Sequence, residues 1–354
     1  MKKLMMVFAI LLTAPIFAQV NPVKYEVHDA HFHLTNYVQN GISIEQHLKN
    51  MGDKVGRSTL FGIPLQQLWS AANTGSYAPT YYLATDDPLY YYSFTDAVIA
   101  TTYLSLPAET KSRFDPMITG FNPADMYAAD HIRRVLKTFP GVFSGIGEFT
   151  LHKEFVSAKV AGPVATTNNP AVDKILDLCA ETGLVAIIHN DIEMPFPKDG
   201  QDNWDLAQFG ALLKRHPNAT IIWAHCGVGR IVRPVLDQVG MLEKAFGNPE
   251  LTHVLIDLSW TETAKYIVST PEATARMAAL MNKYPDRFLF GTDEVAPPDQ
   301  QSYLKTLDLY QPLISKLTPV ARDKFLRGNY ERVFDGARQR VRAWEKANVK
   351  VKTN

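Results

Sequence analysis

Short apolar runs alternate along the chain with longer segments of helical periodicity. Runs such as 185–188 and 220–223 are almost continuously apolar or β-branched, as expected for parallel strands that are covered on both faces. The pattern predicts eight strands, at 25–31, 58–65, 116–121, 143–149, 184–189, 220–225, 253–258 and 287–293. Helical periodicity lies between and after them, at 44–55, 123–138, 171–182, 204–216, 231–246, 271–284 and 300–316, with closing helices at 318–346.

This alternation predicts an α/β fold, a (β/α)8 TIM barrel. Pro123 and Pro271 suit first helical turns, and Gly183 suits a helix end. A doubly wound open sheet is the alternative, and it is disfavoured because the chain has no Gly-rich dinucleotide-binding turn.

One segment interrupts the alternation after the second strand. Residues 66–113 are too long for a simple connection and carry several tyrosines, among them Tyr81 and Tyr90. An insertion at this point predicts either a lid at the C-terminal mouth of the barrel or a helical elaboration of the outer ring. The sequence favours neither the lid nor the helical elaboration.

The first residues have the composition of an export signal. Lys2 and Lys3 precede the apolar run 4–12, which is short for a hydrocarbon core of about 30 Å. We therefore predict a signal peptide at 1–18 rather than a membrane anchor, followed by a single domain at 19–354. The mature protein is expected to be exported, either periplasmic or secreted, with no membrane attachment after cleavage.

Charge and composition limit the classes of partner. The chain has 36 basic and 36 acidic residues and a formal net charge of zero, so it offers no overall field for polyanions, and no nucleic-acid partner is expected. With 46% hydrophobic and 20% charged residues it is expected to be soluble and folded. Its two cysteines do not make a disulfide scaffold.

Histidines at predicted strand ends carry the chemical signal. His31 and His33 form a His-x-His pair, and alternate strand residues project from the same side, so both imidazoles can bind one cation. His189 and His225 end the fifth and sixth predicted strands. Each histidine alone is more often an ordinary core residue, but in a barrel all four meet at one mouth.

Two carboxylates occupy comparable positions. Asp293 ends a strongly apolar run, where burial of a carboxylate without a cation is costly; its alternative is a helix N-cap. Glu148 follows Gly147 at the fourth predicted strand, as a metal ligand or as an ion-pair partner of Lys153 or Arg230. Imidazole and carboxylate ligands suit a divalent metal, one or two ions, with Zn²⁺ as the default.

These residues resemble the amidohydrolase superfamily, in its amidohydrolase-related branch of TIM-barrel metal-dependent hydrolases. The resemblance runs through Asp29–His33, Glu148, Ile188–Asn190, Trp223–Gly227, Gly291–Asp293 and Arg327–Phe334. It implies that His31, His33, His189 and Asp293 hold a metal. It also implies that His225 is either a ligand of a second metal or a side chain that polarises the substrate.

Glu148 departs from the mononuclear, decarboxylase-like members of that branch and looks more like TatD-type nucleases or other binuclear members. In the mechanism that the residues suggest, a metal-activated water attacks the substrate, Asp293 acts as general base and then acid, and His225 stabilises the oxyanion. Expected substrate contacts are Arg230, Asn190 and Trp260, although Arg230 is equally consistent with a surface ion pair.

We therefore expect an enzyme, a metal-dependent hydrolase that cleaves an ester, lactone or amide in a small-molecule substrate. The alternatives are a metal-dependent decarboxylase of an aromatic or muconate-like acid, a TatD-like nuclease, and a binding protein built on an inactive barrel. Neutral charge disfavours the nuclease, and the retained ligand set disfavours the inactive barrel. Assembly into a homo-oligomer is left open.

Overall fold

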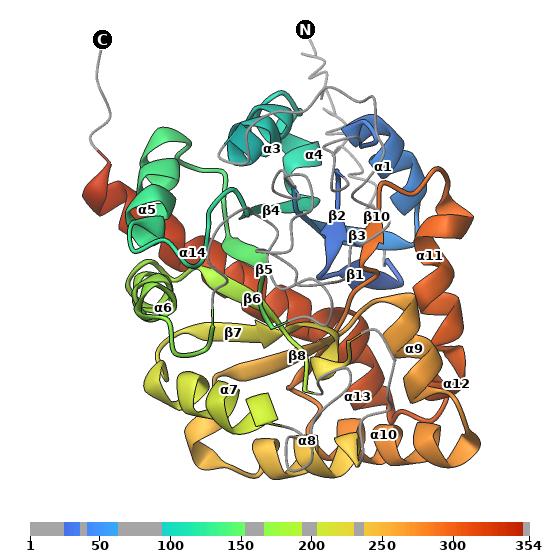
Figure 1. The fold of residues 1–354 in the computed structure, drawn as a ribbon. Coiled ribbons are helices and arrows are strands. Elements are labelled where there is room, and N and C mark those ends of the chain that lie inside the picture. The colour runs from blue at the N-terminus through green and yellow to red at the C-terminus, as the bar shows by residue number, and fades with distance from the viewer. Residues whose placement is uncertain are drawn as a thin grey trace, which may run out of the picture.

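A parallel sheet curls into a barrel with helices around it (Figure 1). The computed structural model describes residues 25–35, 41–62, 94–152, 166–192, 204–229 and 237–349. The predicted signal peptide and its cleavage point lie outside these residues.

The eight barrel strands all pair in parallel, in the order β1-β3-β4-β5-β6-β7-β8-β9. Ala30 N donates to Phe290 O over 2.9 Å, which joins the first strand to the last. The strands are β1 Val27–Asp29, β3 Val55–Leu60, β4 Phe114–Ile118, β5 Gly145–His152, β6 Val185–Asn190, β7 Thr220–Trp223, β8 Val254–Leu258 and β9 Phe288–Phe290. The predicted (β/α)8 barrel is confirmed.

A short second sheet lies next to the point where the first barrel strand, β1, meets the last, β9. β2 (Phe32–His33) pairs in parallel with β10 (Glu294–Val295), and Asp293 N donates to His31 O over 2.7 Å. The segments that carry His31, His33 and Asp293 are therefore hydrogen-bonded to one another.

The core has two layers, because successive strand residues point to opposite faces. The inner layer fills the barrel and includes Val185, Ile187, Ile222 and Leu255. The outer layer lies between strands and helices and includes Ile188. The nearly continuous apolar runs of the sequence are explained by burial of both faces.

Helices surround the sheet much as the periodicity predicts. They are α1 Ile44–Met51, α3 Thr95–Leu104, α4 Ala108–Lys111, α5 Ala128–Thr138, α6 Pro170–Thr182, α7 Trp204–Arg215, α8 Gln238–Phe246, α9 Thr261–Ile267, α10 Pro271–Lys283, α11 Gln300–Leu309, α12 Gln311–Ile314, α13 Pro319–Asp323 and α14 Asn329–Asn348. Gly183 ends α6 in the left-handed conformation, with φ of 83°, as expected for a helix stop. Cys179 and Cys226 are buried and not bonded to each other.

The prediction that Pro123 starts a helix is wrong. Asn122 and Asp125 accept hydrogen bonds from backbone N–H groups two residues further on, which makes local turns, and α5 begins at Ala128. Of the predicted insertion 66–113, residues 94–113 are described and contain α3 and α4. Asp96 of α3 accepts the N–H groups of Thr119 and Gly120 after β4, so this part elaborates the outer ring.

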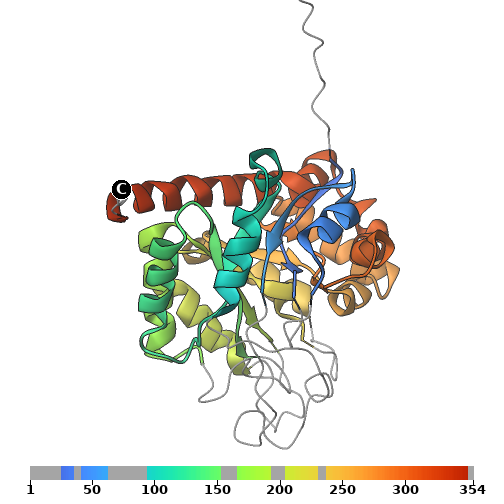
Figure 2. The same cartoon turned by 90° about the horizontal axis from the view of Figure 1, so that it is seen from above.

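Helix α14 lies across the end of the barrel opposite the strand C-termini (Figure 2). Its Tyr330, Val333 and Phe334 belong to the inner core layer, and Arg342 donates to Phe143 O just before β5. This end is therefore closed by packing. Within the part of the chain that the structure describes, no helix is both long and apolar enough to cross a membrane.

Candidate metal centre

Imidazole and carboxylate groups meet at the open mouth of the barrel. Two sets of three side chains place their ligand atoms within 4.8 Å of one another, and both sets include His31. The sets are His31, His33 and Asp293, and His31, Glu148 and His225. These residues come from four separate segments of the chain, and their approach is a consequence of barrel closure.

Asp293 lies between the two histidines of the His-x-His pair. Its Oδ1 is 3.3 Å from His31 Nε2 and 3.1 Å from His33 Nε2. The Asp293 side chain is 14% exposed, whereas those of His31 and His33 are 0% and 4% exposed. In this set the carboxylate is therefore the group that reaches the open side of the mouth.

Glu148 connects the other two strand-end histidines. Its Oε1 lies 2.6 Å from His189 Nδ1 and 3.2 Å from His225 Nε2, and its Oε2 is 3.9 Å from His33 Nε2. The second nitrogen of His189 is 2.7 Å from Asp191 Oδ1. His189 thus joins the cluster through Glu148, and its Nε2 would have to leave Asp191 to bind an ion.

Local irregularities aim two of these side chains inward. Ala224 already points to the inner layer, so alternation alone would turn His225 outward, but the left-handed backbone of His225, with φ of 55°, reverses that direction. In β5, Ile146 and Phe149 both pack in the outer layer and the register shifts between them. The extra residue turns Glu148 toward His189 and His225.

Gly147 and Gly291 make room for this arrangement. A Cβ at Gly147, where φ is 96°, would lie 2.2 Å from Ile187 O. A Cβ at Gly291 would lie 2.7 Å from the Cβ of His31 and 2.8 Å from that of Ser259. Both glycines are required by the close approach of neighbouring strands at the mouth.

The cluster is strongly coupled electrostatically. Burial opposes a charge on His31, but the carboxylates of Asp257 and Asp293 outweigh it and raise the pKa of His31 to about 9. Burial also opposes the charge on Asp293, yet the imidazoles of His225 and His31 hold its pKa well below the usual range. Burial lowers the pKa of His225. Asp293 is therefore a carboxylate at neutral pH and His225 a neutral ring.

Sequence reasoning missed three residues that contact the histidines. Asp257 Oδ2 lies 3.0 Å from His31 Nδ1, Ser259 Oγ lies 2.8 Å from His225 Nδ1, and Asp191 bonds His189 as described. Asp257 carried a usable signal, because it is a carboxylate inside the apolar run of β8, the same feature that drew attention to Asp293.

The three residues expected to contact the substrate do not all lie at the metal centre. The Trp260 ring lies next to His225, with centroids 5.4 Å apart. Asn190 follows the inward-facing His189, so alternation places it on the outer face of β6, where its side chain donates to Asp191 O. Arg230 lies outside the described residues. Trp260 is the one of the three whose position here supports a substrate contact.

The donor set fits a divalent metal. Imidazole nitrogens and carboxylate oxygens are the ligands that zinc, manganese and iron accept. His31 Nε2 makes no hydrogen bond within the described residues although the side chain is fully buried. A bound cation would supply the partner that this atom lacks.

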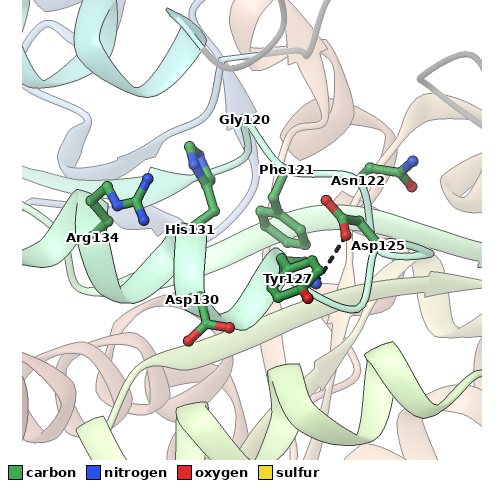
Figure 3. A pocket seen from close by; sticks show the side chains of 9 residues that line it. Gly120, Phe121, Asn122, Asp125, Tyr127, Asp130, His131 and Arg134 are labelled. Atoms are coloured by element: carbon green, nitrogen blue, oxygen red, sulfur yellow. Dashed lines mark hydrogen bonds between the residues drawn. The ribbon is translucent and has the colours of Figure 1, made fainter.

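A separate hollow lies outside the barrel, between the end of β4 and α5 (Figure 3). It has a volume of about 250 Å³ and is lined by Phe121, His131 and Arg134, among others. His131 Nε2 is 3.8 Å from Asp96 Oδ2. Asp125 and Asp130 also line the hollow, but the sets of three clustered ligand atoms found within the described residues are both at the barrel mouth, so its chemistry is not repeated here.

Fold and site together define a (β/α)8 barrel with a candidate metal centre at the C-terminal ends of its strands. A family model described as amidohydrolase matches residues 29–336, and the chain belongs to this family, which consists of metal-dependent enzymes. No curated protein sequence matches the chain significantly.

Solved structures of low sequence identity share the fold. A Pseudomonas putida protein named as a candidate 2-pyrone-4,6-dicarboxylic acid hydrolase is 13% identical, with a TM-score of 0.53 over 88% of this chain and 98% of that one. A Burkholderia multivorans amidohydrolase with bound zinc is 14% identical, with a TM-score of 0.53 over 87% and 99%. The 2,6-dihydroxybenzoate decarboxylase from Rhizobium is 14% identical, with a TM-score of 0.53 over 88% and 99%.

Proposed function

We propose that this protein is a metal-dependent hydrolase that cleaves an ester, lactone or amide bond in a small organic molecule. The position of Asp293 carries the proposal. Its carboxylate touches the nitrogens of His31 and His33 from the open side of the mouth, while the other ligand side chains are nearly inaccessible. A proton acceptor lies there between the ligand atoms and the space from which water and substrate approach.

In this mechanism His31, His33, His189 and Asp293 would hold a divalent ion, with Zn²⁺ as our proposal. Such an ion supplies an acidified water and polarises the carbonyl under attack. Asp293 accepts the proton of the attacking water at a carboxylate oxygen and returns it to the leaving group. His225 Nε2 lies 3.8 Å from Asp293 Oδ2, so its ring borders the same reacting space.

Trp260 would form an apolar wall for the substrate beside His225. The neutral net charge supports a small-molecule substrate rather than a nucleic acid. Decarboxylation of an aromatic acid is the second candidate, because the same donor set can polarise a hydroxybenzoate and a solved structure of the same fold is a decarboxylase.

Metal analysis followed by a substrate panel tests the proposal. We expect one or two equivalents of metal per chain, loss of activity with a chelator, and recovery with added zinc. Lactones, esters and amides should be hydrolysed, with no release of carbon dioxide from hydroxybenzoates. Carbon dioxide release without hydrolysis would identify a decarboxylase instead, and DNA cleavage that falls steeply with salt would identify a nuclease.

A further inference from the structure

Asp257 on β8 accepts hydrogen bonds from three groups at the metal centre. Its Oδ2 lies 3.0 Å from His31 Nδ1, and its Oδ1 lies 2.8 Å from the backbone N of His225 and 2.5 Å from Ser259 Oγ. The side chain is fully buried, and the alternation of β8 turns it inward next to Leu255. Asp257 belongs to neither of the two metal-ligand sets.

The positions of the hydrogens follow from these contacts. A carboxylate only accepts, so His31 Nδ1 and Ser259 Oγ must each donate a hydrogen to Asp257. Ser259 has one hydrogen and has used it, so its Oγ accepts from His225 Nδ1 at 2.8 Å. A neutral imidazole has a single N–H, so Nε2 of the neutral His225 ring carries a lone pair. His31 Nε2 carries one as well once that ring has lost the second proton that its raised pKa of about 9 retains in the metal-free protein.

Both Nε2 atoms lie close to carboxylate oxygens. His225 Nε2 is 3.2 Å from Glu148 Oε1, and His31 Nε2 is 3.3 Å from Asp293 Oδ1. Two acceptors at such distances repel each other unless a proton or a cation lies between them. The hydrogen bonds that Asp257 and Ser259 make with the two Nδ1 atoms therefore leave the Nε2 atoms of His31 and His225 ready to bind a metal.

We propose that Asp257 and Ser259 are positioning residues, which fix the nitrogen that His31 and His225 each present to the metal centre. This inference rests on the metal centre of the proposed function. It assigns His225 to metal binding together with His31 and Glu148, since a ring with its N–H turned toward Ser259 has no hydrogen to donate to a substrate oxyanion. Asp257 acts on both histidines. Ser259 acts mainly on His225, because its Oγ lies 2.8 Å from His225 Nδ1 but 3.4 Å from His31 Nδ1.

Few neighbouring groups among the described residues can replace a hydrogen-bond acceptor that is lost from Asp257. In Asp257→Asn one oxygen becomes an NH₂ group, which faces either His31 Nδ1–H or the donors from His225 and Ser259. One of the histidines must then lose its support. The space between Gly291 and the Cβ atoms of His31 and Ser259 is too small for a methyl group, so neither residue can shift toward Gly291 to find another partner.

Zinc affinity measured by competition with a chromophoric chelator tests the proposal on the full-length protein. Asp257→Asn should weaken zinc binding about 10–100-fold, and Ser259→Ala about 3–10-fold, the range expected for groups that orient metal ligands. Ser144→Ala is the matched control, since Ser144 donates to the buried Asp115 at the opposite end of the barrel. That variant should bind zinc within about twofold of wild type.

Histidine ¹⁵N NMR of the wild-type protein tests the same proposal without depending on whether a variant folds. His31 and His225, assigned by His31→Gln and His225→Gln, should both carry hydrogen on Nδ1 in the zinc-loaded protein and in the metal-free protein at about pH 10. An Nε2–H form of either ring would overturn the proposal.

The outcomes separate the two proposals. Unchanged zinc affinity in a folded Asp257→Asn overturns the positioning role, and a Ser259→Ala variant that loses turnover but keeps its zinc affinity overturns the assignment of His225. If the wild-type protein binds no zinc, the proposed function fails, while the metal-free NMR spectrum still decides the tautomers. If zinc binds but nothing is hydrolysed, the positioning role is unaffected.

Discussion

Both ends of the barrel bury aspartates, but they neutralise them differently. At the closed end, Asp115 on β4 contacts Arg57 at 2.8 Å, Arg338 at 2.6 Å and the Tyr330 hydroxyl at 2.8 Å. Guanidinium groups are permanently charged, so this network is complete by itself. It stabilises the contact between the sheet and α14.

At the mouth, the charged partners of Asp257 and Asp293 within the described residues are imidazoles. A protonated imidazole can release its proton to solvent and bind a metal at the same nitrogen, whereas a guanidinium cannot. The ion pairs of the closed end thus stabilise the fold at every pH near neutrality. The imidazoles of the mouth can instead lose protons and bind a cation. Variants at the two ends should therefore affect different measurements.

The largest effect is expected for Asp293→Asn. The amide cannot accept the proton of the attacking water, so kcat should fall about 10²–10⁴-fold while the unfolding midpoint changes little. Steady-state kinetics on the best substrate of the panel checks this. The matched control is Glu294→Gln, the neighbouring carboxyl, which should keep kcat within a few-fold; near-normal turnover of Asp293→Asn would exclude it as the general base.

At the closed end, Arg57→Met should lower the free energy of unfolding by about 3 kcal/mol, because it leaves the buried Asp115 with one guanidinium instead of two. Zinc affinity should not change. Urea denaturation provides the measurement. Arg276→Met serves as the control, since its ion pair with Asp237 is exposed to solvent and should contribute little to stability. Weaker zinc binding in Arg57→Met would show that the two ends are coupled.

The mouth should also respond to pH in the metal-free protein. The pKa of His31 is raised to about 9 in the folded state from 6.5, so its protonation stabilises the fold fully below about pH 6.5. This contribution, at most about 3 kcal/mol, should be lost as the pH rises through about 9.

Urea midpoints between about pH 6 and pH 10 measure this loss, and the difference from metal-free His31→Gln isolates the contribution of His31. Zinc takes the place of the proton, so the loaded protein should lack this slope. An identical slope in loaded and metal-free protein would mean that His31 does not bind the ion.

The sequence predicted the architecture because burial on both faces leaves a direct mark on strand composition. The start of β3 at Val55 was missed, since Gly56 and Arg57 interrupt the apolar pattern and Arg57 is neutralised by Asp115, a residue of the next strand. A charge that is balanced by a distant partner has no local signature.

The strand-end histidines and Asp293 could be found because residue type and position are visible in the sequence. Their roles relative to Asp257 could not, because in the sequence both aspartates are carboxylates within or directly after an apolar run, and they look alike. The direction of the Asp257 side chain depends on the alternation of β8. The direction of the Asp293 side chain depends on the turn after β9, where Asp293 has φ of 53°. For His225, the inward direction depends on a left-handed backbone that residue type does not reveal.

The smallest expected effect concerns Trp260, which borders the mouth beside His225. Loss of the ring in Trp260→Ala should raise KM about tenfold, with zinc affinity unchanged, because the substrate loses an apolar wall and the ligands keep their supports. The Trp260 backbone has φ of 72° and ψ of 133°, a conformation that glycine adopts readily and other residues do not. Trp260→Gly should therefore be about 1 kcal/mol more stable than Trp260→Ala and show the same KM. A loss of zinc in both variants would place the ring among the supports of the metal centre instead.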